Sequence, residues 1–224
     1  MGTEGRPLAV FDLDGTITRT DTLAPFLLRC LARRPWRLAR LPLVVPAAVR
    51  YLFDHDRGAL KGALLRATLG GLSRGWLEQR SAAFVQGLLS LGLFDEARIA
   101  IETHRSRGDR LLLMSASTDL YVPQIADQLG FEQVLCSRVR WRADGRLDGR
   151  LDGPNCRGAE KQRQLQELIE RDHPARVYAY GNSAADLAHM RLAHEAFLVN
   201  GPRRLPIPVA VQRLRWSQAS RAVQ

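Results

Sequence analysis

Cysteine is scarce in this chain of 224 residues, which contains only Cys30, Cys136 and Cys156. Their spacing fits no common metal-binding pattern, and an odd number cannot pair completely in disulfides within one chain. We therefore expect free thiols in a reducing compartment. No signal peptide precedes the first apolar stretch, which begins at residue 8, so the expected location is cytoplasmic.

Acidic residues are absent from residues 22–53, although arginine occurs there six times. The uncharged run at residues 41–49 is much shorter than the roughly 20 residues needed to cross a bilayer, and two prolines interrupt it. A Trp-, Tyr- and Arg-flanked apolar segment such as residues 36–53 suits peripheral contact with an anionic membrane, here the inner membrane. It suits an ordinary buried helix of an all-α subdomain equally well, and the sequence leaves both interpretations open.

Motifs for nucleic-acid recognition are also missing, although the formal net charge is +10. The chain has no zinc-finger spacing, no aromatic string of the RNP type and no lysine-rich tail. Its arginines interleave with apolar residues instead of forming a basic stripe, so we expect no nucleic-acid partner. The excess of arginine fits a lipid or phosphorylated ligand, or simply the composition of a GC-rich genome. Nothing in the sequence indicates an oligomeric state.

The most specific feature of the chain lies near its start. An apolar stretch at residues 8–11 predicts a short buried strand, and the string Asp-Leu-Asp-Gly-Thr-Ile-Thr follows it directly. Side chains alternate along a strand, so an extended backbone aims both carboxylates, Asp12 and Asp14, toward the carboxyl end, where ligands bind in open α/β sheets. Neighbouring carboxylates raise each other's pKa and therefore need a cation or a division of roles. The alternative is an Asp-Gly turn in which Asp14 merely caps a helix.

A helical insertion separates this strand from the rest of the chain. Apolar residues recur at helical spacing from residue 17 to residue 93, which predicts a compact bundle of about four helices. We therefore divide the chain into a core, residues 1–16 and 94–224, and an inserted helical domain, residues 17–93.

Strands and helices alternate beyond residue 94, which predicts an α/β fold with a parallel sheet. The expected helices are 94–107, 119–129, 158–171 and 184–193, and the expected strands are 110–114, 133–136, 176–180 and 196–199, with a hairpin at 141–153. No internal repeat is present. The tail from residue 201 is rich in proline and arginine and receives no assignment.

Polar residues follow several of the expected strands. Ser115 ends the second strand beside the first amides of a helix, which favours a phosphate ligand, although serine is also an ordinary helix cap. Lys161 stands near a helix start, where a positive charge is unfavourable. An anionic partner would explain that lysine, although surface lysines are common. Asn182 and Asp186 follow the next strand.

In this order, the four sites resemble the motifs of the haloacid dehalogenase (HAD) superfamily of aspartyl-phosphate phosphatases. The opening string is similar to the first motif, Ser115 to the second, Lys161 with its Cys-x-Gly-x-x-Lys context to the third, and Asn182 with Asp186 to the fourth. The resemblance covers residues 8–190. It implies a Rossmann-like core with a parallel sheet. Because the helical insertion directly follows the first motif, it also implies a C1-type cap, as in the phosphoserine phosphatase-like subfamily IB.

The resemblance also implies a role for each motif residue. Asp12 would be the nucleophile that forms an aspartyl-phosphate, and Asp14 would be the general acid and base. Ser115, Lys161 and backbone amides near Ala116 would hold the phosphoryl oxygens.

A magnesium ion is implied as cofactor. Its ligands would be the Asp12 carboxylate, the Asp14 main-chain carbonyl and the Asn182 side chain. Asn182 departs from the family pattern, in which aspartate is usual; an amide oxygen still ligates a hard cation, so we expect weaker metal affinity. Asp186 would act through a water ligand or orient Lys161.

The substrate is less clear from the sequence. In phosphoserine phosphatases, a glutamate shortly after the first motif holds the substrate amine and a cap arginine holds its carboxylate. Here Asp21 stands at the first position and Lys61 lies near the second, so the pattern departs from phosphoserine. The Arg-flanked, Pro-interrupted cap segment and the third motif resemble phosphatidylglycerophosphate phosphatases of the C type. We therefore expect either a small phosphorylated metabolite or a lipid phosphate. A third alternative is a non-catalytic, phospho-ligand-binding relative, with Asn182 as the sign of decay.

Overall fold

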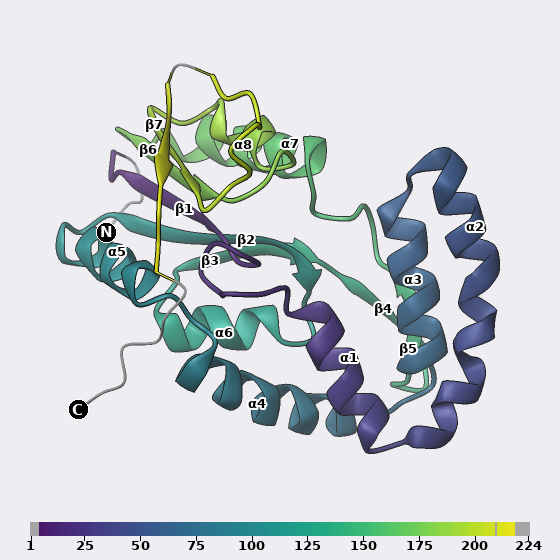
Figure 1. Cartoon of the computed structure of the whole chain (residues 1–224). Coiled ribbons are helices and arrows are strands. Elements are labelled where there is room, and N and C mark those ends of the chain that lie inside the picture. Colours follow the sequence, from purple (N-terminus) through teal and green to yellow (C-terminus); the bar gives the residue numbers. More distant parts are fainter. Residues whose placement is uncertain (1–4, 209, 218–224) are drawn as a thin grey trace.

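The computed structural model of the chain describes residues 5–208 and 210–217. Within these residues, six parallel strands form the main sheet in the order β3-β2-β1-β6-β7-β8, with helices on both faces (Figure 1). The strands are β1 Leu8–Asp12, β2 Arg110–Thr118, β3 Gln133–Ser137, β6 Val177–Gly181, β7 Glu195–Val199 and β8 Val211–Leu214. The predicted Rossmann-like α/β core is therefore confirmed.

Strand β1 is central, and all of its residues are buried. Its side chains alternate between two apolar clusters: Ala9 and Phe11 belong to one, and Leu8 and Val10 belong to the other. Such burial on both faces is expected for a parallel sheet covered by helices. It explains why this strand appears in the sequence as a continuous apolar run.

Helices α5 and α6 contribute to the first of these clusters, and helices α7 and α8 to the second. Their bounds are α5 Asp95–Ser106, α6 Val122–Leu129, α7 Ala159–Asp172 and α8 Leu187–Met190. The expected helix at 184–193 is only four residues long. It begins late because the Asp186 carboxylate accepts hydrogen bonds from the Asn182 and Ser183 amides at 3.3 and 3.1 Å, and this holds the preceding residues in a turn.

The insertion is helical, as predicted, and its helices form two groups. Helices α1 and α4 lie close to α6, and Phe26, Phe84 and Tyr121 form an aromatic cluster there with ring centroids 4.8 to 5.4 Å apart. The η1 segment with helices α2 and α3 stands farther out, beside the β4–β5 hairpin (Figure 1). The bounds are α1 Leu23–Ala32, η1 Pro35–Val44, α2 Val45–Asp54, α3 Arg57–Thr68, α4 Arg74–Leu91, β4 Val139–Trp141 and β5 Leu147–Leu151.

Helix α3 packs directly on strand β5 of this hairpin. Gly149 has φ +95°, and a Cβ there would lie 2.4 Å from the Cα of Arg66. Only glycine permits both the backbone conformation and this close approach. The hairpin predicted at 141–153 therefore forms, and it joins the inserted helices to the core.

The apolar segment 36–53 does not form a buried helix. It is a 3₁₀ helix followed by α2, and α2 contains no buried residue. Leu52 and Phe53 are 70% and 81% exposed. The interpretation as an ordinary core helix is wrong, because helix α3, on which η1 and α2 pack, covers only one side of this segment. Among the described residues, no helix has the length and apolar character needed to cross a membrane.

Part of the unassigned tail completes the sheet. Strand β8 pairs in parallel with β7, and the Asn200 side chain exchanges hydrogen bonds with the main chain of Trp216 at 3.0 and 3.1 Å. Residues 218–224 lie outside the described part of the chain.

Candidate active site

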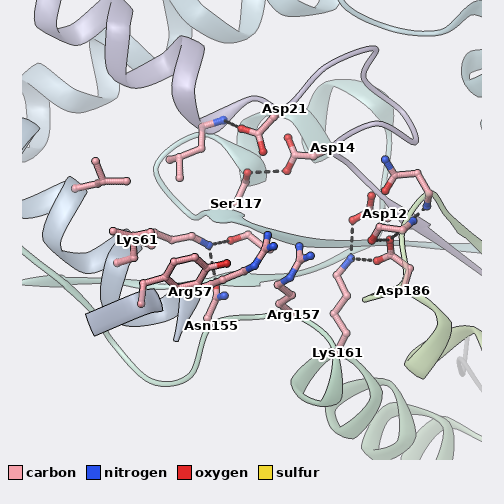
Figure 2. Close-up of a pocket in the computed structure, with 17 residues that line it drawn as sticks. Asp12, Asp14, Asp21, Arg57, Lys61, Ser117, Asn155, Arg157, Lys161 and Asp186 are labelled. Atoms are coloured by element: carbon pink, nitrogen blue, oxygen red, sulfur yellow. Dashed lines mark hydrogen bonds and ion pairs between the residues drawn. The ribbon is translucent and has the colours of Figure 1, made fainter. Parts of the chain in front are cut away.

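A cavity of about 320 Å³ opens at the carboxyl ends of β1, β2 and β6 (Figure 2). Its walls come from the opening motif, from helices α2 and α3, and from the loops that precede α7 and α8. Parallel α/β sheets place ligand sites at this edge. The cavity is at the lower end of the size range of small-molecule pockets.

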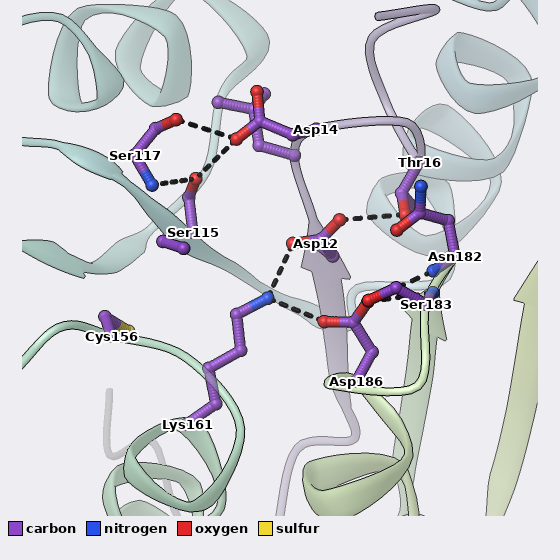
Figure 3. A network of polar contacts seen from close by, with 12 residues as sticks. Asp12, Asp14, Thr16, Ser115, Ser117, Cys156, Lys161, Asn182, Ser183 and Asp186 are labelled. Carbon is purple, nitrogen blue, oxygen red and sulfur yellow. Dashed lines mark hydrogen bonds and ion pairs between the residues drawn. The ribbon is translucent and has the colours of Figure 1, made fainter. Parts of the chain in front are cut away.

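Asp12 ends β1 and lies between two donors. Its Oδ1 atom accepts a hydrogen bond from Lys161 Nζ at 2.5 Å, and its Oδ2 atom accepts one from Thr16 Oγ1 at 3.0 Å (Figure 3). These bonds fix the carboxylate at the cavity wall.

Asp14 lies beyond the end of β1, and its carboxylate is held separately. One oxygen accepts hydrogen bonds from the amide and the hydroxyl of Thr22 at 2.7 and 2.6 Å. The other accepts from Ser117 Oγ at 2.7 Å and from Ser115 Oγ at 3.3 Å. The two carboxylates therefore line one cavity with different partners, which permits different roles.

Gly15 makes this turn possible. Its φ is +78°, and a Cβ there would lie 2.0 Å from Nδ2 of Asn182. The Asn182 side chain thus packs directly against the Asp-Gly turn, near Thr16 (Figure 3).

Lys161 lies in the first turn of α7 and is buried, with its ammonium between two carboxylates. Nζ is 2.5 Å from Asp12 Oδ1 and 2.9 Å from Asp186 Oδ1. These two anions explain a lysine at an otherwise unfavourable helix start. Although burial opposes the charged form, the two carboxylates hold the pKa of Lys161 above its usual range.

The carboxylates at this site have divergent pKa values. Burial raises the pKa of Asp12 to about 7, and the negative charge of Asp186 adds to this rise against the opposing effect of Lys161. Burial also raises the pKa of Asp14, with a contribution from Asp21. Burial acts in the same direction on Asp186, but the charge of Lys161 outweighs it and holds the pKa of Asp186 below its usual range.

The expected phosphate-binding residues lie beside these carboxylates. Ser115 is buried and lies near the carboxyl end of β2. Its hydroxyl donates to Asp14 and accepts from the Ser117 amide at 3.0 Å. Ala116 lines the cavity, and its carbonyl oxygen accepts hydrogen bonds from Lys61 and from Ser137 Oγ.

Asp21 and Lys61 also line the cavity, as expected for substrate-binding residues. The Asp21 carboxylate is committed to the start of α1, where it accepts from the Leu23 amide at 2.9 Å. Lys61 Nζ donates to the Ala116 carbonyl and to Asn155 Oδ1. Burial lowers the pKa of Lys61 to about 8.

Sequence reasoning missed several residues of the site. Thr22 and Ser117 hold Asp14, and Arg57, Asn155 and Arg157 line the cavity. The second serine of the Ser-Ala-Ser string at the end of β2 was a visible signal for Ser117. Nothing in the sequence linked Arg57 to Arg157, because they are separated by 100 positions.

The residues present fit a hard divalent cation. Among the described residues, no three His, Cys, Asp or Glu side chains gather as a metal site, but the implied ligands include a main-chain carbonyl and an amide, which such a cluster would not contain. The charges that act on Asp12 are two carboxylates, Asp186 and Asp14, and one ammonium, Lys161. This excess of negative charge, together with the Asn182 side chain in the lining of the same cavity, suits a magnesium ion.

Asp186 differs from the other carboxylates because donors occupy both of its oxygens. Oδ1 accepts from Lys161, and Oδ2 accepts from the hydroxyl and the amide of Ser183 at 2.7 and 3.1 Å. Asp186 thus contacts Lys161, the residue that it would orient in one of its two expected roles, the other being action through a water ligand.

The family of the chain follows from comparison with known proteins. A model of haloacid dehalogenase-like hydrolases matches residues 9–191. The chain therefore belongs to this family, and the prediction of a phosphatase of the HAD type is confirmed at this level.

Individual proteins support the same assignment. Protein CicA of Caulobacter vibrioides is 35% identical over 188 residues, which are 84% of this chain and 83% of that protein. A histidinol-phosphatase of Neisseria meningitidis is 25% identical over 208 residues, which are 86% of this chain and 90% of that protein. A probable phosphoserine phosphatase of Vibrio cholerae has the same fold, with a TM-score of 0.66 at 16% identity over 91% of this chain and 58% of that chain.

Proposed function

We propose that this chain hydrolyses phosphate monoesters through a phosphorylated Asp12 and that it uses Mg²⁺. The observation that carries the proposal is that the two carboxylates have separate hydrogen-bond partners. Asp12 is fixed by Lys161 and Thr16, whereas Asp14 is fixed by Thr22 and Ser117. Two carboxylates with separate supports can act as nucleophile and as acid.

In the first step, a carboxylate oxygen of Asp12 attacks phosphorus and forms a new P–O bond. The bond from phosphorus to the leaving oxygen breaks, and Asp14 gives its proton to that oxygen. The raised pKa of Asp14 favours the protonated form that this step requires. In the second step, Asp14 takes a proton from water, whose oxygen attacks phosphorus and releases inorganic phosphate and free Asp12.

Other side chains stabilise the charge of the phosphoryl group. Lys161 places its ammonium 2.5 Å from the attacking carboxylate, and Asp186 orients it there. The amide of Ala116, a residue that lines the cavity, would donate to phosphoryl oxygens. Ser115, whose hydroxyl donates to Asp14 in this structure, would have to turn its hydroxyl toward the phosphoryl group to do the same. Asp12, the carbonyl of Asp14 and Asn182 would hold Mg²⁺, which when bound offsets the negative charge of the transferring group.

The size of the cavity favours a small phosphorylated molecule as substrate. A lipid phosphate is the second candidate, with peripheral binding to an anionic membrane as in phosphatidylglycerophosphate-type phosphatases. The exposed apolar side chains of α2 favour a lipid phosphate, because the same helix also contributes Tyr51 to the cavity wall. In either case we propose a cytoplasmic location.

The direct test is Mg²⁺-dependent hydrolysis of p-nitrophenyl phosphate by the wild type and by Asp12→Asn. Turnover should depend on Mg²⁺ and should fall by more than about a thousandfold in the variant, because the amide is not a nucleophile. Unchanged turnover in Asp12→Asn would show that Asp12 is not the nucleophile. A wild type that binds phosphate without turnover would favour a non-catalytic relative.

A further inference from the structure

Three cationic side chains line the cavity beside the catalytic carboxylates. Arg57 begins α3, Lys61 lies one turn later on the same helix, and Arg157 stands in the loop before α7. In Figure 2 both guanidinium groups project between Lys61 and Lys161. Two separate parts of the chain therefore bring positive charge to the same space.

Among the residues that the structure describes, Arg57 and Arg157 have no anionic partner. Within residues 5–208 and 210–217, neither guanidinium group makes a hydrogen bond or an ion pair. Arg163 pairs with Glu160 and Glu167, whereas other exposed arginines among the described residues, such as Arg191, form no ion pair. Arg57 and Arg157 are distinguished because both line the same cavity.

Acids near these cations are used for other purposes. Asp56 adjoins Arg57 in the sequence, but its carboxylate accepts from the amides of Gly58 and Ala59 at 2.8 and 3.0 Å and caps α3. Asp21 likewise accepts from the Leu23 amide at the start of α1. Among the described residues, neither carboxylate forms an ion pair with Arg57, Lys61 or Arg157.

Lys61 is held in place without a carboxylate. Its ammonium donates to the Ala116 carbonyl and to Asn155 Oδ1, the latter at 2.5 Å. Asn155 Oδ1 also accepts from Ser137 Oγ at 3.0 Å, which fixes the amide. A largely buried cation that has only neutral acceptors gains when an anion arrives.

We propose, building on the phosphatase function above, that Arg57, Lys61 and Arg157 form a second anion subsite. The preferred substrate carries a second phosphate group, as a monoester or diester, besides the phosphoryl group that is transferred to Asp12. Two guanidinium groups and an ammonium suit a phosphate better than a single carboxylate, because guanidinium groups bind phosphate in a bidentate manner.

The test uses three esters that differ only in the second group: glycerol 3-phosphate, 3-phosphoglycerate and glycerol 1,3-bisphosphate. We expect kcat/KM for the bisphosphate to exceed that for glycerol 3-phosphate by at least about tenfold, since charge-assisted hydrogen bonds provide that much discrimination. The Arg57→Gln/Arg157→Gln variant should lower this ratio to about one. Arg163→Gln, which removes an exposed arginine outside the cavity, should leave the ratio unchanged.

A binding measurement separates this inference from the catalytic proposal. Asp12→Asn should bind glycerol 1,3-bisphosphate by calorimetry, and adding the two arginine substitutions should weaken binding by at least about tenfold. Arginine-dependent binding without turnover in the wild type would support the subsite and contradict the phosphatase. Turnover with a bisphosphate ratio near one, a preference for 3-phosphoglycerate, or equal losses on all three esters would overturn the subsite and leave the phosphatase standing.

Discussion

Ser117 Oγ donates a hydrogen bond of 2.7 Å to the carboxylate of Asp14, although 103 positions separate the two residues. Thr22 holds the other oxygen of the same carboxylate and also contacts the Tyr121 hydroxyl at 3.0 Å. Asp14 is therefore held both by Thr22, which directly precedes α1, and by Ser117 of β2. This support sets the position from which Asp14 would give and take its proton.

Ser117→Ala tests this relationship. Loss of the hydrogen bond should misplace the acid, so kcat should fall about tenfold for alkyl phosphates, whose leaving oxygen needs a proton. The fall should be smaller for p-nitrophenyl phosphate, whose leaving group departs without one. Ser106→Ala, an exposed serine on α5, is the matched control. An equal loss on both substrates would contradict the assignment of Asp14 as acid.

Asn182→Asp tests the departure from the family pattern. The substitution keeps the shape of the side chain beside Gly15 and adds a negative charge at the expected metal site. We expect Mg²⁺ to bind about tenfold tighter, with activity retained, because a carboxylate is a stronger ligand than an amide. Calorimetric titration with Mg²⁺ measures the change. Unaltered affinity would show that Asn182 does not touch the metal.

Metal binding should depend on pH through Asp12. Burial raises the pKa of Asp12 to about 7, so the metal-free protein holds a proton there below pH 7 and Mg²⁺ must displace it. The apparent affinity should therefore fall as the pH decreases, by about tenfold between pH 8 and pH 6. Calorimetry at both pH values measures this. Asp12→Asn has no such proton and should lose the dependence; a wild type with equal affinity at both pH values would contradict the account.

The exposed face of α2 gives a test of the lipid alternative. Leu52→Ser/Phe53→Ser should abolish flotation with vesicles that contain anionic lipid, since apolar insertion and arginine attraction act together there. Leu91→Ser/Ile99→Ser removes exposed apolar side chains at other sites and serves as control. If the wild type does not float, or if both variants behave alike, α2 does not bind the membrane.

The sequence was sufficient for the features that depend on local pattern. The apolar run of β1 and the alternation beyond residue 94 correspond to what is observed. Asp12 and Lys161, two of the motif residues, line one cavity. Strand β8 was missed because Val211–Leu214 is four residues long, follows a Pro-rich stretch and has no alternating apolar pattern.

Long-range contacts account for the rest. The bond from Ser117 to Asp14 and the convergence of Arg57 with Arg157 depend on how distant segments pack. The exposure of α2 depends on how little of the fold covers it. The shortness of α8 depends on hydrogen bonds to the Asp186 carboxylate.

The central claim is that Asp12 carries the phosphoryl group during turnover. The most direct measurement is mass spectrometry of the protein quenched in acid during steady-state hydrolysis of p-nitrophenyl phosphate with Mg²⁺. The account predicts one added phosphoryl group on the peptide that contains Asp12, and none in Asp12→Asn. Rapid turnover with no label on that peptide, or a label on another residue, would contradict it.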